Sequence, residues 1–337
     1  MNQNRFVKIC KQIGKNKNLV QGGGGNISLK ISKNEMIVKA SGIELEKVST
    51  KKGIAKIDFK KIAKFIESAA KKNLYSEEKY VKAIRESTFE NKKTWPSMET
   101  GFHAILGKAV IHTHPITINT LTCEKNGKTL LKQALGKMSF EWIPFKNPGI
   151  ELSIEILRRT RKNSMKNKTR VIFLKNHGLI VSSNSLEKCR QKTLAIESKI
   201  LKFLKQAKKI KPILFTNLSI NEAENLNYTV KVAENFNLKK QEKYFKKFLF
   251  PDSVVYYENG FSLSENKTKT IIIKKDKKIT IMEKNPAKRK RILETALAHL
   301  CIMHNILQFG TPVFLKQKNV NKIKRMKLEK IRKAISQ

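Results

Sequence analysis

The sequence predicts an α/β protein followed by a small α+β region. Up to Pro212, helical segments with one apolar face alternate with short apolar strands, which is the pattern of a layered α/β core. Beyond Pro212 the pattern changes to short strands, two of them rich in isoleucine, flanked by helices. A chain of 337 residues is long enough for about two domains. We therefore predict domains over residues 1–212 and 213–337.

The first part of the chain predicts helices around a pair of strands. An amphipathic helix spans 5–19, with Phe6, Ile9 and Ile13 on its apolar face. Asp58 lies near the start of a second helix. The further elements expected in this part are strands over 26–31 and 36–39 and helices over 57–73 and 76–86.

The middle part predicts alternating strands and helices around several histidines. One strand begins at Ala109 and stops at Pro115, because proline cannot continue a central strand. Ser185 has the side chain of an N-cap for the long helix that follows it. The other elements expected here are helices over 98–106, 115–122, 150–160 and 185–208 and strands over 141–144, 171–174 and 179–181.

The last part of the chain carries no recognisable motif and ends in a basic tail that starts at Lys316. Its histidines, His299 and His304, are five residues apart and share no helix face well, so we assign them structural or surface positions. The elements expected here are helices over 221–236 and 288–307 and strands over 250–257, 270–273 and 278–281.

The composition is strongly basic, with 71 lysines and arginines against 27 acidic residues and a net charge of +44. Basic residues occur along the whole chain, so we interpret the charge as a compositional bias of solvated faces. The alternative is binding to nucleic acid or another anionic surface. The densest clusters, 284–291 and 316–333, match no nucleic-acid motif, and nucleic acid is not expected as a partner. The positive field would still attract anionic substrates.

The cysteines indicate a reducing compartment. All four (Cys10, Cys123, Cys189 and Cys301) stand alone without CxxC spacing, which predicts free thiols rather than a disulfide framework. The first residues lack the apolar core of a signal peptide, and no apolar run reaches the roughly 18 residues of a membrane span. We expect a soluble cytoplasmic protein with no membrane partner.

Two histidines at the end of the strand from Ala109 are the strongest chemical signal. His112 and His114 are two residues apart, so on a strand their side chains lie on the same face. His177 follows a second apolar strand, and Glu99 lies near the start of a helical segment. Three neutral imidazoles leave a metal ion an open position for substrate, as catalytic sites require. The sequence therefore predicts a catalytic metal site with a nearby carboxylate.

A simpler interpretation exists for each of these residues. A lone pair of histidines on a strand is more often structural than metal-binding, and Glu99 could be a solvated helix residue. The third histidine favours the metal site. We assign His103, four residues after Glu99, to packing or hydrogen bonding in preference to ligation.

Consecutive glycines, Gly22 to Gly25, form a loop that opens a strand at Asn26. Glycine allows positive φ angles and close approach of the backbone to a ligand, so this loop could form an anion nest. The alternative is a flexible hairpin connection. The loop is neither a P-loop, which continues into Gly-Lys-Ser/Thr, nor a Rossmann loop, which opens a helix.

Four stretches occur in a characteristic order along the chain: GGGGNIS with KASGI, then SMETGFH, then VIHTHP, then KNHGLIV before a helix. Together they resemble the class II aldolase/adducin family of zinc-dependent sugar aldolases and epimerases, over about residues 5–210. The GGGGN and VKASG stretches look most similar to those of a bacterial subgroup whose aldolase domain resembles rhamnulose-phosphate aldolases. In some members of this subgroup the domain is fused to a short-chain dehydrogenase. No dinucleotide fingerprint follows Pro212, so we expect the dehydrogenase part to be absent.

The resemblance implies a three-layer α/β/α fold with a mainly antiparallel central sheet, often assembled as a homotetramer. It also implies that zinc stabilises an enediolate during cleavage of a C–C bond, with Glu99 as the acid/base residue. Where many members have a second serine, this chain has Met98, and no catalytic tyrosine can be matched. The zinc ligands implied are His112, His114 and His177, and the phosphate-binding residues are Gly25, Asn26, Ser41, Gly42 and Ser97.

Two kinds of function follow from the sequence. The first is a zinc-dependent aldehyde-lyase acting on a sugar phosphate or related ketose, with epimerisation or dehydration as variants of the same chemistry. The second is a non-catalytic, adducin-like scaffold whose basic tail binds an anionic partner. Adducin-type heads tend to lose the metal ligands, whereas this chain keeps all three histidines, which favours the enzyme.

Overall fold

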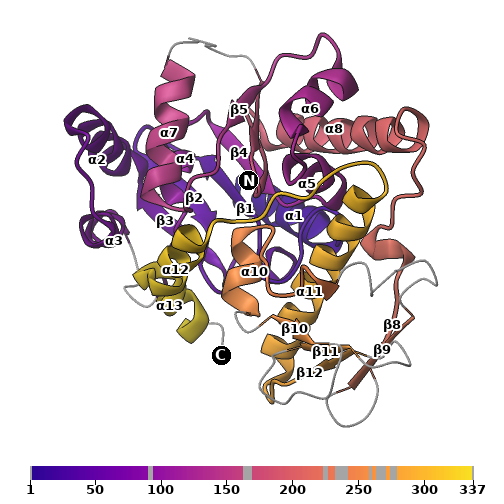
Figure 1. Ribbon diagram of the computed structural model, residues 1–337. Helices are drawn as coiled ribbons and strands as arrows, with labels where there is room; N and C mark the ends of the chain where they lie inside the picture. The colour runs from indigo at the N-terminus through magenta and orange to yellow at the C-terminus, as the bar shows by residue number, and fades with distance from the viewer. Residues whose placement is uncertain are drawn as a thin grey trace.

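A seven-stranded sheet forms the centre of the molecule (Figure 1). The computed structural model describes residues 2–89, 94–161, 169–222, 227–231, 242–257, 260–262, 271–273 and 279–335. The strand order is β3-β2-β1-β4-β7-β6-β5, and every neighbouring pair is antiparallel except β5 and β6. The strands are β1 (Asn26–Lys30), β2 (Glu35–Lys39), β3 (Ile54–Asp58), β4 (Ala109–Thr113), β5 (Glu141–Ile143), β6 (Arg170–Leu174) and β7 (Gly178–Ser183).

Helices cover both faces of this sheet (Figure 1). On one face, Ile111 and Val181 pack against four helices, and on the other face Val110 and Ile180 pack against two. Neighbouring strand residues point to opposite faces, so both faces are apolar. The predicted three-layer fold with a mainly antiparallel sheet is confirmed. The first face carries α1 (Asn2–Lys15), α5 (Ile116–Thr122), α6 (Gly127–Leu135) and α8 (Leu186–Gln206). The second face carries α4 (Thr100–Ile105) and α7 (Ile150–Arg161). Helix α2 (Phe59–Lys72) packs against both α4 and α7.

Side-chain caps set where several helices begin. Asp58, Ser76 and Ser185 precede α2, α3 (Glu77–Glu86) and α8, and each accepts a hydrogen bond from a backbone N–H of the first turn. Such a cap contributes about 1 kcal/mol to stability. The N-cap predicted for Ser185 is confirmed.

Two elements of this first part were not predicted. Strand β3 lies at the edge of the sheet, and only Ala55 and Ile57 are fully buried in it. Its apolar pattern is therefore too weak to predict a strand from the sequence. Because β3 runs to Asp58, helix α2 begins two residues later than expected. Helix α6 buries Leu130 and Leu131 against α8 and the sheet face.

Beyond Pro212 the described residues form a second sheet of five strands, together with several helices. The strand order is β10-β11-β12-β9-β8, and this small sheet lies at the lower right of Figure 1. The predicted α+β character is therefore confirmed, as are the strands within 270–273 and 278–281 and the helix over 288–307. The strands are β8 (Ser219–Glu222), β9 (Asn227–Lys231), β10 (Phe261–Ser262), β11 (Ile271–Ile273) and β12 (Ile279–Ile281), and the helices are α10 (Pro251–Tyr256) and α11 (Pro286–Leu307). Two short 3-10 helices, Leu45–Lys47 and Phe215–Asn217, complete the loops.

The strand predicted over 250–257 is wrong, because this segment is helix α10. Pro251 occupies the first helical position, where a backbone N–H would have no partner within the helix, and Asp252 lies in the first turn. The helix packs against α11 and α12 and buries Val254 and Val255. A short apolar run buried on all sides has no helical periodicity, which explains the error.

The helix predicted over 221–236 is wrong for its described residues, which lie in strands β8 and β9. Ser219 pairs with Lys231 and Glu222 with Tyr228 in an antiparallel hairpin. Residues 223–226 and 232–236 lie outside the described residues. The pairing with β12 shows that long-range sheet contacts overrode the local helical pattern.

The predicted basic tail folds as two helices, α12 (Gln317–Arg325) and α13 (Lys327–Ile335). They pack against α10 and α3 respectively, and Ile323 is buried. One hydrophobic cluster includes both Ile116 of α5 and Leu297 of α11, so the core continues from the central sheet into the later part of the chain. The domain boundary at residue 212 stays a prediction. Among the described residues, no helix is long and apolar enough to cross a membrane.

Candidate metal centre

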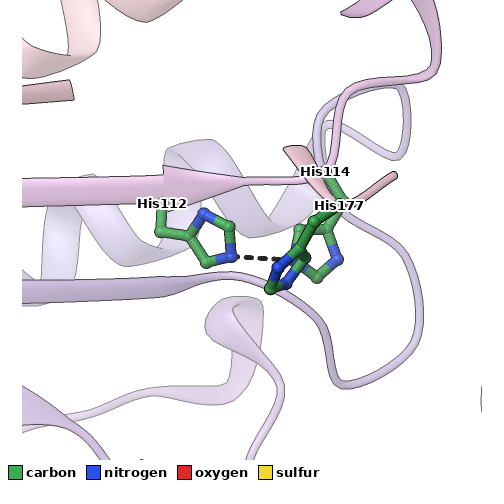
Figure 2. A group of neighbouring side chains, drawn as sticks. All are labelled: His112, His114 and His177. Carbon is green, nitrogen blue, oxygen red and sulfur yellow. Dashed lines mark hydrogen bonds between the residues drawn. The ribbon is translucent and has the colours of Figure 1, made fainter. Parts of the chain in front are cut away.

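Three histidines converge at one end of the central sheet. His112 is the penultimate residue of β4, His114 follows that strand, and His177 lies in the turn between β6 and β7. One ring nitrogen from each lies within 4.8 Å of the others, and the exposed fractions are 0%, 6% and 4%. Figure 2 shows the three rings pointing toward one another. The structure therefore brings together all three residues that the sequence predicts as ligands.

Oxygen atoms lie beside the Nδ1 atoms of two of these rings. His112 Nδ1 lies 2.9 Å from the carbonyl oxygen of Leu179, and His114 Nδ1 lies 3.1 Å from Asp252 Oδ2. Where these oxygens accept the Nδ1 hydrogens of the neutral rings, the two Nε2 atoms carry the lone pairs. Burial, and then the neighbouring His114 and His177, lowers the pKa of His112 well below its usual value, which keeps that ring neutral.

The two Nε2 atoms lie 2.9 Å apart (Figure 2). Two acceptors at this distance repel unless a cation or proton lies between them. The group of His112, His114 and His177 can therefore hold a metal ion, and the donor set of imidazole nitrogens fits a divalent transition metal.

Glu99 lies against this group. It is the residue before α4, and its carboxylate oxygens lie 3.5 Å from His112 Nε2 and 3.4 Å from His177 Nε2. Asn26 Nδ2 donates a hydrogen bond of 2.6 Å to Glu99 Oε2. The pairing of β1 with β4 places Asn26 opposite His112, so the sheet register itself brings this amide to the carboxylate. Glu99 is thus held where it faces the ring nitrogens of His112 and His177.

The residues predicted to bind an anion share one cavity with His114 and His177. Ser41 N donates to the carbonyl oxygen of Trp95, which brings the loop before α4 onto the end of β2. Gly25 has a φ of +74°, and a Cβ there would lie 3.0 Å from the carbonyl oxygen of His112, so only glycine fits. The cavity has a volume of about 30 Å³, room for roughly two water molecules. Its lining includes Gly25, Asn26, Ser41, Gly42, Ser97, Glu99, His114 and His177.

Three further residues of the same cavity were missed by the sequence analysis: Lys39, Asp252 and Glu329. Lys39 is 3% exposed, and its Nζ donates to the carbonyl oxygen of Gly23 over 3.3 Å. A lysine at the end of a short apolar strand was a signal that could have found it. Asp252 and Glu329 come from α10 and α13, far along the chain, and no local pattern links them to the histidines.

His103 has the hydrogen-bonding position that we assigned to it. Its Nδ1 lies 2.7 Å from Ser28 Oγ, and its ring stacks on Phe102. Burial, and to a smaller extent the nearby charge of Lys30, lowers the pKa of His103 to about 3. His299 is likewise buried and hydrogen-bonded to Tyr257, so it is structural.

The fold and the histidine group define a class II aldolase-type domain. Residues 4–200 match the model of the class II aldolase and adducin N-terminal domain, and the chain belongs to this family. The predicted family resemblance is thereby confirmed.

Individual relatives extend the comparison. The chain is 30% identical over 195 residues to the uncharacterized oxidoreductase YuxG of Bacillus subtilis, which covers 55% of this chain but only 27% of that protein. The N-terminal class II aldolase domain of a conserved Thermoplasma acidophilum protein is 25% identical with a TM-score of 0.52, covering 60% of this chain and 94% of that one. A sugar-phosphate aldolase from Thermotoga maritima is 13% identical with a TM-score of 0.46, covering 62% and 96%.

Proposed function

We propose that the protein is a metal-dependent aldehyde-lyase that cleaves or forms a C–C bond in a sugar phosphate or related ketose. The observation that carries the proposal is the convergence of His112, His114 and His177 beside Glu99, whose carboxylate lies 3.5 Å from His112 Nε2. Zinc is the proposed ion, because three imidazoles and an open position are typical of catalytic zinc sites. Bound there, the ion would polarise neighbouring carbonyl and hydroxyl oxygens of the sugar and stabilise the negative charge that develops on them.

Glu99 is the proposed acid/base residue. Its carboxylate lies beside the ligand nitrogens, so it can take a proton from, or return one to, a substrate carbon or hydroxyl held there. Asn26 donates to Glu99 Oε2 and holds that oxygen in place, and Oε1, on the side of His177, is the proposed atom for proton transfer. A carboxylate held in this way needs little rearrangement before it acts.

The anionic group of the substrate is proposed to bind at Gly25, Asn26, Ser41, Gly42 and Ser97. Met98 lacks the hydroxyl that many family members offer, and Lys39 supplies a buried ammonium in the same cavity. An ammonium gives a phosphate both charge and hydrogen bonds. Lys39 therefore strengthens the proposal of a phosphorylated or otherwise anionic substrate.

Epimerisation and dehydration are variants of the same chemistry, because they also begin with charge developing next to a carbonyl. The three activities share the histidines and Glu99 and differ in the bond that breaks, so the products distinguish them. A homotetramer is the proposed assembly, and light scattering on the purified protein tests it.

The test is a panel of ketose phosphates assayed for aldehyde release with and without a metal chelator. Glu99→Gln should keep stoichiometric metal but lose about a hundredfold or more of the turnover, as expected for an acid/base residue. Glu187→Gln removes a carboxylate from α8 on the outer helical layer and should change neither property. Wild-type protein that binds no divalent metal, or Glu99→Gln with full turnover, would contradict the proposal.

A further inference from the structure

We infer that Asp252 is a positioning residue that orients His114 as a metal ligand. The region beyond residue 212 then completes the metal site of the aldolase-type domain. The inference rests on the proposed metal site, but it concerns a residue that lies outside the family match over residues 4–200.

The two side chains meet in a way that matches this role. Asp252 Oδ2 lies 3.1 Å from His114 Nδ1, and the carboxylate is 5% exposed. His114 Nε2, the other ring nitrogen, faces His112. A carboxylate that accepts the Nδ1 hydrogen fixes both the tautomer and the ring orientation, and it makes Nε2 a stronger donor to a metal.

His112 provides an internal comparison. Its Nδ1 also faces an acceptor, but that acceptor is the neutral carbonyl of Leu179 from the neighbouring strand. The central sheet therefore orients His112 without help, whereas His114 lies beyond the end of β4. Its charged partner comes from α10, so the second region controls this ligand.

The segment before Asp252 is itself attached to the turn that carries His177. Asn176 Nδ2 donates to the carbonyl oxygens of Leu249, over 2.9 Å, and of Val313, over 2.6 Å. Asn176 has a φ of +55°, a conformation that asparagine tolerates better than most residues. These hydrogen bonds hold the start of α10 in register with the histidine turn, and Asp252 is placed accordingly.

Gly24 shows how closely the pair is enclosed. A Cβ built on Gly24 would lie 2.6 Å from Asp252 Oδ2 and 2.7 Å from His114 Nδ1. No side chain fits there without displacing one of these two atoms. The glycine loop thus packs directly on the contact between the carboxylate and the imidazole.

The test measures the Zn²⁺ dissociation constant of the full-length protein by competition with a chromophoric chelator. We expect Asp252→Ala to weaken zinc binding by about 10- to 100-fold. Asp252→Asn should lose less zinc affinity than Asp252→Ala, because the amide oxygen can still accept the Nδ1 hydrogen of His114. Glu294→Gln is the matched control: Glu294 is a buried carboxylate of α11 that accepts from Gly22 N over 2.7 Å but touches no metal-binding histidine. Its zinc affinity should match the wild type.

A double-mutant cycle separates positioning from folding. In a His114→Ala background, Asp252→Ala should cause no further loss of zinc affinity, because its partner is gone. An equal loss in both backgrounds would overturn the inference, and so would unchanged affinity in the single Asp252→Ala variant while the wild type binds zinc. If the wild type binds no divalent metal, the proposed function fails, and the inference fails with it.

Discussion

Lys39 is a buried ammonium among backbone and hydroxyl groups of the cavity. Its exposed fraction of 3% shows that it is screened little by solvent, and its Nζ donates to the carbonyl oxygen of Gly23. It lies at the end of β2, next to the loop that carries Ser41 and Gly42. An anion in the cavity would therefore meet a full positive charge in addition to neutral donors.

We expect Lys39→Met to weaken the binding of inorganic phosphate about 10- to 100-fold, the range for a lost hydrogen bond to a charged group. Isothermal titration calorimetry measures the dissociation constant. Lys64→Met, on the exposed side of α2, is the control and should bind as the wild type does. Equal binding by both variants would show that Lys39 does not contact the anion.

Gly24→Ala should lower zinc affinity by separating Asp252 from His114, because its Cβ would lie under 3 Å from both side chains. Gly136→Ala is a contrasting variant: its Cβ would meet nothing within 4 Å, but its φ is +59°. That change should cost about 1–3 kcal/mol of stability and leave zinc affinity unchanged. Chelator competition and chemical denaturation measure the two properties, and full zinc affinity in Gly24→Ala would count against the close packing.

Among the elements beyond residue 212, α10 packs against α11. The hydroxyl of Tyr257, just after α10, lies 2.7 Å from Nδ1 of His299 on α11. Burial lowers the pKa of His299 to about 3. Helix α10, which carries Asp252, is thus linked to α11 through a histidine that is neutral in the folded protein.

This neutral histidine predicts a pH dependence of stability. In the unfolded chain His299 titrates near pH 6.5, so between about pH 6.5 and 3 the unfolded state binds more protons than the folded state. The free energy of unfolding should therefore fall, by about 1.4 kcal/mol per pH unit, as the pH decreases through this window. Above about pH 6.5 the contribution of this histidine to the slope should vanish.

Urea denaturation of the wild type and His299→Gln, from about pH 7 to about pH 4.5, measures this contribution as a difference in slope. The wild type should lose stability more steeply by about 1.4 kcal/mol per pH unit. Other titrating groups, including His103, are common to both proteins and cancel in the difference. Parallel curves would mean that His299 is not held neutral by the fold.

At the scale of the whole molecule, the two parts of the chain share a hydrophobic core and close one cavity. Ile116 of α5 and Leu297 of α11 belong to the same buried cluster. The 30 Å³ cavity is bounded by the glycine loop on one side and by Pro251, Asp252 and Glu329 on the other. Both parts of the chain therefore contribute residues to this cavity.

A shared core predicts cooperative unfolding. Differential scanning calorimetry of the full chain should show a single transition, because exposing either part uncovers the apolar surface of the other. A chelator should lower the midpoint of that transition, since a metal present at 1,000 times its dissociation constant adds about 4 kcal/mol to the folded state. Two separate transitions, with only one sensitive to the chelator, would show that the parts unfold independently.

Most of the central fold could be predicted from local sequence patterns. The strands around Ile27, Ile111 and Val181 are short apolar runs ended by glycine, proline or polar residues, and these signals depend only on neighbours in the sequence. Strand β3 and helix α10 could not be predicted in the same way. β3 has few buried residues at a sheet edge, and α10 is too short and too fully buried, against α11 and α12, to show a helical period.

The layered fold and the three histidines that meet at the end of the sheet follow from local sequence patterns. Spacing along strands sets which side chains share a face, so His112 and His114 could be paired from the sequence. The contact of Asp252 with His114, and the presence of Lys39 and Glu329 in the same cavity, depend on how distant segments pack together. These contacts join segments far apart in the chain, and they form because the common core packs α10 and α13 over the end of the central sheet.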